Sequence, residues 1–179
     1  MTFLTPTKSF EESDAARLLM NSVQYLAMAN LVIESEKFKQ NPRKYNRPIL
    51  NTLATGIELL IKFSHVQHGA TVDEIAIRYR HNIWKLWREC PEPTLVDLTL
   101  QVAKQSYADA LAQSIVEPIA DVPDEFRRVL RNLSKLHSAG GSQLRYLAPP
   151  NVKATAPGWL TQTFYSVAEV CLRRPPFGP

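Results

Sequence analysis

The sequence contains few cysteines and lacks several short motifs on which particular enzyme classes depend. It has two cysteines, Cys90 and Cys171, and they do not form a C-x-x-C pair. Each lies at the edge of a predicted helix, so we expect reduced core thiols, with a disulfide between them as the alternative. No glycine-rich phosphate loop and no G-x-S-x-G nucleophile elbow is present. The sequence therefore gives no support to a P-loop nucleotide-binding protein or to an α/β-hydrolase.

Long apolar runs are also missing. No uninterrupted apolar stretch approaches the roughly 18–20 residues that span a bilayer. The first residues, which include Glu11 and Glu12, lack the apolar core of a secretion signal. We therefore expect a cytoplasmic protein with no membrane segment. With 45% hydrophobic and 21% charged residues among 179, the composition is that of a globular chain, and we expect a single domain over residues 1–179.

Alternating runs of β-branched residues, which are typical of strands, do not occur, whereas helical periodicity recurs along the chain. Apolar residues are repeatedly spaced by three and four positions, and prolines fall between the periodic segments. We predict helices at 9–36, 48–68, 72–79, 83–90, 94–117, 123–139 and 159–173, a loop at 37–47 and an extended connection at 142–158. The sequence thus predicts an all-α bundle of about six or seven helices with a short extended C-terminal tail.

Helix start signals support several of these boundaries. Thr71 and Glu74 have the T-x-x-E spacing of a capping box, as do Ser9 and Glu12 in the S-x-x-E form. Asn82 is a suitable N-cap for the helix that begins at Ile83. In the 94–117 helix, the predicted apolar face runs through Leu100, Ala103, Tyr107 and Leu111, and further apolar residues beside it suggest contacts on two sides.

The helix at 48–68 and the corner after it contain two runs of interest. The run GIELLIKFSHVQHG contains Glu58, Leu59, Leu60 and Lys62, and the run IRYRHNIWKLW contains Tyr79, His81, Ile83, Leu86 and Trp87. These residues resemble the two signatures of HEPN-domain proteins. Two positions depart from the pattern, because Arg80 stands where the family usually has Gly and Asn82 where it has Asp. The residues alone also predict that Glu58 and Lys62, four apart, share one side of their helix. The resemblance implies a HEPN-like helical bundle that forms a homodimer.

A candidate catalytic pair lies in the 123–139 helix. Ribonucleases of the HEPN family carry an R-x4-6-H motif, and Arg131 and His137 are separated here by five residues. The resemblance implies metal-independent RNA cleavage, in which His137 assists proton transfer at a 2′-hydroxyl and Arg131 stabilises charge on the phosphate. On a continuous helix, however, the two side chains are about 120° apart, so they converge only if the helix ends between them. The alternative is that His137 interacts with the last carbonyls of its helix.

Basic residues occur in clusters that can contact an anionic partner. The formal net charge is +4, which permits such a partner without requiring one. The candidate RNA-binding residues are Arg78, Arg80, His81, Arg127, Arg128 and Arg145. The alternative for most of them is a solvated charged face, and for His81 it is a hydrogen bond to backbone at the corner.

We predict no metal and no cofactor. His65 and His68 are three apart on a helix and can share a metal, but no third ligand is evident near them in the sequence. The resulting functional hypothesis is a HEPN-like protein that binds RNA, a nucleotide or a protein partner, with endoribonuclease activity if it is catalytic. The alternative is a non-catalytic helical module for dimerisation or for docking a partner such as a nucleotidyltransferase.

Overall fold

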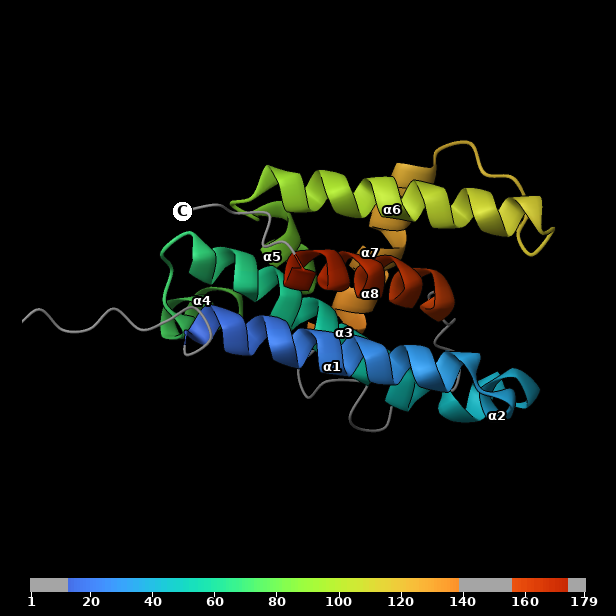
Figure 1. The fold of residues 1–179 in the computed structure, drawn as a ribbon, viewed down its shortest axis with the longest axis horizontal. Helices are drawn as coiled ribbons and strands as arrows, with labels where there is room; N and C mark the ends of the chain where they lie inside the picture. The colour runs from blue at the N-terminus through green and yellow to red at the C-terminus, as the bar shows by residue number, and fades with distance from the viewer. Residues whose placement is uncertain (1–12, 139–155, 174–179) are drawn as a thin grey trace, which may run out of the picture.

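The computed structural model describes residues 13–138 and 156–173, and within these ranges it is entirely helical (Figure 1). The elements are α1 (Asp14–Glu34), α2 (Glu36–Gln40), α3 (Pro42–Gln67), α4 (Val72–Tyr79), α5 (Ile83–Arg88), α6 (Pro93–Ala112), α7 (Val122–Ser138) and α8 (Pro157–Arg173). The predicted all-α class is therefore confirmed. None of the described helices is both long and apolar enough to cross a bilayer.

The long helices α1, α3, α8 and α6 run side by side across Figure 1, and α7 lies behind them. α3 is the central element, because it packs on α1, α5, α7 and α8. Gly56 allows the close approach of α1 to α3, since a Cβ at this position would lie 2.8 Å from Cγ of Leu26. At the same place the Ser22 hydroxyl donates to the Gly56 carbonyl at 2.8 Å. The bundle is thus built outward from α3.

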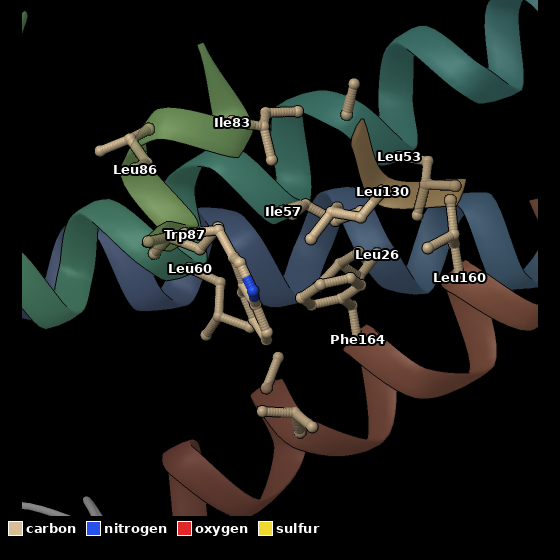
Figure 2. Close-up of a cluster of buried hydrophobic side chains, with 14 of the residues drawn as sticks. Leu26, Leu53, Ile57, Leu60, Ile83, Leu86, Trp87, Leu130, Leu160 and Phe164 are labelled. Atoms are coloured by element: carbon tan, nitrogen blue, oxygen red, sulfur yellow. The ribbon is translucent and has the colours of Figure 1, made fainter. Parts of the chain in front are cut away.

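The hydrophobic core is formed where α1, α3, α5, α7 and α8 meet (Figure 2). Phe164 lies at its centre, and its ring contacts those of Trp87 and Phe126 at centroid distances of 6.0 and 5.8 Å. Burial of aromatic rings contributes a large share of the stability of a domain of this size. Trp87 itself is buried.

The predicted loop at 37–47 is wrong. Ser35 ends α1 and accepts a hydrogen bond from the Phe38 backbone, which starts α2. Asn41 then caps α3 by accepting from the Lys44 backbone, so α3 begins at Pro42 and Pro48 lies inside it rather than at its start. The added helix raises the number within the described residues to eight. A polar and basic composition did not prevent helix formation, because two side-chain caps satisfy the free backbone N–H groups.

Two other predictions need correction or lie outside the described residues. The first helix is capped by Ser13, whose side chain accepts from the Ala16 backbone, whereas Ser9 and Glu12 lie outside the described residues. α6 ends at Ala112, and its buried face runs through Leu95, Thr99, Ala103, Ser106 and Tyr107. Ala103 and Tyr107 are buried as predicted, whereas Leu100 is half-buried and Leu111 is exposed. The face was mispredicted because Thr99 and Ser106 are buried with their hydroxyls bonded to backbone carbonyls of their own helix, which removes the usual cost of burying them. Most of the predicted connection at 142–158 also lies outside the described residues.

Candidate functional site

The corner between α4 and α5 is a tight turn fixed by α7. The Asn82 backbone donates to the Tyr79 carbonyl at 2.9 Å, and Arg80 between them has φ 50° and ψ −119°. These angles are those of the first central residue of a type II′ turn, a position that favours glycine. The HEPN pattern that the sequence resembles has glycine here. Arg80 therefore holds a backbone conformation that is costly for a residue with a Cβ.

Asn82 is the N-cap of α5, as predicted. Its Oδ1 accepts from the Lys85 backbone at 2.9 Å and from the Ser134 hydroxyl of α7 at 3.2 Å. The Ser134 Oγ in turn accepts from the Trp84 backbone at 2.9 Å. These bonds join the corner to α7 one helical turn before His137.

Glu58 of α3 lies at the centre of a polar cluster beside this corner. His137 of α7 approaches its Oε2 through Nε2 at 2.7 Å, and His81 approaches the same oxygen through Nδ1 at 3.2 Å. Lys62 Nζ binds the other oxygen, Oε1, at 2.6 Å, which confirms the predicted pairing within the helix. The Glu58 and His137 side chains are 7% and 1% exposed, whereas that of His81 is 54% exposed. The cluster is thus a buried carboxylate and imidazole with one imidazole at the surface.

The electrostatics of the cluster favour the ionised carboxylate. Burial by itself raises the pKa of Glu58, but the hydrogen bond from His137 and the charge and hydrogen bond of Lys62 outweigh it and lower that pKa to about 2. A buried carboxylate persists only where partners of this kind satisfy it. Removal of His137 or Lys62 should therefore raise the pKa of Glu58.

The structure does not bring Arg131 and His137 together. α7 is continuous through both residues, so they point in different directions, as their spacing requires. Arg131 is exposed and stacks on Trp84, with the guanidinium carbon 4.5 Å from the ring centroid. The alternative for His137, an interaction with the last carbonyls of α7, is wrong, because His137 binds Glu58 instead. The backbone hydrogen bond suggested for His81 is also replaced by the bond to Glu58.

The predicted RNA-binding arginines are dispersed, and several have acidic partners. Arg78 pairs with Glu89 at 2.7 Å on the far side of the corner. Arg127 binds Asp124 at 2.8 Å, and Arg128 binds Glu125. Arg80 is exposed at the turn, and Arg145 lies outside the described residues. These acidic partners neutralise part of the charge of Arg78, Arg127 and Arg128. Arg127 also lines a pocket, which is described next.

A pocket of about 330 Å³ opens between α5, α6 and α7. Its lining includes Trp84, Trp87, Arg88, Asp97 and Arg127. This pocket was not predicted from the sequence, although Trp84, Trp87 and Arg88 lie three and four positions apart, on one side of a helix. The Arg131 guanidinium stacks on the ring of Trp84, one of the lining residues. The pocket therefore combines indole surfaces with two arginines and one carboxylate.

His65 and His68 do not point at a common position. His65 Nε2 contacts the Leu86 carbonyl at 3.3 Å, and burial lowers the pKa of this imidazole. His68 contacts the Ser64 carbonyl through Nδ1 at 2.9 Å and Glu92 through Nε2 at 3.4 Å. Cys90 and Cys171 are both free thiols, and burial raises the pKa of Cys171 to about 12. The interpretation of reduced thiols is therefore confirmed for both cysteines.

The candidate site comprises the Glu58 cluster, the turn at Arg80 and the pocket that Trp84 and Arg127 line. When the chain was compared with models of protein families, with curated proteins and with solved structures, it matched none of them.

Proposed function

We propose that this protein binds single-stranded RNA through the pocket between α5, α6 and α7. The observation that carries the proposal is the combination, in one pocket, of Trp84 and Trp87 with Arg88 and Arg127. Unpaired bases stack on aromatic rings and on guanidinium planes, and arginine pairs with phosphate. The Arg131 guanidinium, already stacked on Trp84, offers a planar surface of this kind.

The acidic group of the pocket fits the same ligand. Asp97 can accept a hydrogen bond from a base amino group or a ribose hydroxyl, and it repels phosphate. We therefore place the base between Trp84 and Asp97 and the phosphate toward Arg88 and Arg127. A single nucleotide fits a volume of about 330 Å³, which is within the usual range of ligand pockets.

Binding is tested with a fluorescently labelled single-stranded RNA in anisotropy titrations at several salt concentrations. Trp84→Leu should weaken binding by about 1–3 kcal/mol, because it removes a stacking surface. Arg127→Ala should weaken binding and lower the slope of log K against log salt by about 0.7. Arg17→Ala is the matched control, since Arg17 is an exposed α1 residue that also has an i,i+3 acidic partner. Equal effects of Arg127→Ala and Arg17→Ala would contradict the assignment.

A more specific proposal, which rests on the resemblance to HEPN ribonucleases, is that Arg131 and His137 cleave the bound RNA. We place binding before cleavage because the His137 side chain is 1% exposed and occupied by Glu58. If the pair is catalytic, cleavage should survive EDTA and leave a 2′,3′-cyclic phosphate. His137→Gln is the variant of choice, because its amide can still donate to Glu58 but cannot transfer a proton. Cleavage by His137→Gln at the wild-type rate would exclude His137 as the catalytic group.

A second candidate function, a homodimerisation or docking module, is favoured by the outer face of α1. Met20, Met28 and Leu31 are 46%, 57% and 71% exposed and lie within about 80° of one another around the helix. Clustered exposed apolar side chains are typical of interaction surfaces. Light scattering should give twice the chain mass of 20.3 kDa, and Leu31→Glu should restore the single mass. A monomer at all working concentrations would contradict the homodimer. The outer face of α1 would then serve to dock another protein, for example a nucleotidyltransferase.

A further inference from the structure

We propose that Glu58, His81 and His137 form a binding site for a divalent transition metal, of which Zn²⁺ is the expected occupant. One ligand-type atom from each residue lies within 4.8 Å of the other two. The residues come from α3, from the α4–α5 turn and from α7, so the tertiary fold alone brings them together. Two imidazoles and a carboxylate, with one position left open, form a recurrent set of zinc ligands. The proposal is independent of RNA binding, but a metal on His137 would prevent this imidazole from transferring a proton in RNA cleavage.

The distances between the ligand atoms of the cluster require only a small rearrangement of the side chains to hold a metal. Nε2 of His137 and Nδ1 of His81 lie 2.7 and 3.2 Å from the same oxygen of Glu58. Zinc bonds of about 2.0–2.1 Å place neighbouring ligand atoms of a tetrahedral shell roughly 3.4 Å apart. Each nitrogen-to-oxygen distance must therefore widen by less than about 1 Å, and the two nitrogens, which lie within 4.8 Å of each other, must also come to about this separation. Because His81 is at the surface and 54% exposed, its side chain can move and a metal can enter beside it.

The surroundings of the cluster also bear on metal binding. Lys62 holds Oε1 and thereby orients Oε2 toward the imidazoles. The hydrogen bonds from the two imidazoles to Glu58 satisfy the cluster without a metal, so a metal must displace them in order to bind.

Two features should make zinc binding weaker here than in closed structural zinc sites. The Lys62 charge repels a cation. Coordination through Nε2 of His137 also leaves the ring proton on Nδ1, a buried atom without a hydrogen-bond partner among the described residues. We therefore expect binding in the micromolar range rather than the nanomolar range of closed structural zinc sites. Lys62→Met should tighten zinc binding although it removes a buried ion pair.

The test is a titration of the EDTA-stripped full chain with ZnCl2 by calorimetry, and with CoCl2 by visible absorption. Wild type should bind one metal per chain, and His81→Ala should weaken binding at least tenfold. Because His81 is exposed, this variant should keep the fold, which circular dichroism checks. His81→Cys should retain binding and add a sulfur-to-cobalt charge-transfer band. His68→Ala is the matched control, because His68 is also a surface imidazole beside a carboxylate but lies outside the cluster.

The outcomes separate the two interpretations of the cluster. Loss of binding in His81→Ala with retention in His81→Cys and His68→Ala supports the site. If wild type binds zinc no better than His81→Ala, or if His68→Ala is equally damaging, the proposal is overturned and the cluster is a network of hydrogen bonds only. Neither result alters the interpretation of RNA binding, because the titrations contain no RNA.

Discussion

Acid should destabilise this protein in a way that depends on Glu58. In the folded chain the pKa of this carboxyl is lowered from 4.5 to about 2, so the carboxylate contributes stability that is fully present above pH 4.5. That contribution is lost as the pH falls through about 2. The difference of about 2.5 units, at about 1.36 kcal/mol per unit, corresponds to about 3 kcal/mol in total and to about 2 kcal/mol by pH 3. The side chain is 7% exposed, so solvent screening reduces this figure little.

The variant Glu58→Gln isolates this contribution. At pH 7 it should be less stable than wild type by about 3–5 kcal/mol, because it leaves the partly buried Lys62 ammonium without its counter-charge. The stability gap should then narrow by about 2 kcal/mol between pH 7 and pH 3, since wild type loses the contribution and the variant has none to lose. Urea unfolding followed by far-UV circular dichroism, in EDTA, gives the gap at each pH.

The control for this prediction is Glu36→Gln. Glu36 pairs with Lys39 on the surface, where an ion pair contributes little, so the variant should follow the wild-type curve at every pH. A gap between wild type and Glu58→Gln that stays constant from pH 7 to pH 3 would refute the assignment of a depressed pKa to Glu58. The acid sensitivity would then have to come from other carboxylates.

The remaining predictions concern the corner and the α1–α3 contact. Asn82→Ala should cost about 0.5–2 kcal/mol, toward the upper end because Ser134 also loses its acceptor, and an unchanged melting midpoint would exclude the capping role. Arg80→Gly should stabilise the fold by about 1 kcal/mol, since φ is 50° there; a lowered midpoint would show that the Arg80 side chain contributes more than its backbone costs. Gly56→Ala should cost about 1–3 kcal/mol despite the better helix propensity of Ala, because the new Cβ would meet Leu26, and a stabilised variant in urea unfolding would contradict the close contact.

The sequence determined much of the secondary structure, because helix periodicity and caps are local signals. The capping box of Thr71 and Glu74 is present in full, and the cap at Asn82 is as predicted. The inward face of α7, which carries Phe126 and Leu130, follows the helical spacing of apolar residues on which the prediction of this helix rested. These features depend on residues within a few positions of one another, and free backbone N–H groups are satisfied in the same way in most contexts.

Only the tertiary structure decided which polar residues meet. From the sequence, Glu58 was one half of a helical ion pair with Lys62, and His81 and His137 were separate candidates. The fold brings His81 and His137, 23 and 79 positions away in the chain, onto one carboxylate oxygen of Glu58. That convergence depends on how α3, α5 and α7 pack. Packing is fixed by the shapes of the buried faces over the whole core, which no local pattern of residues contains.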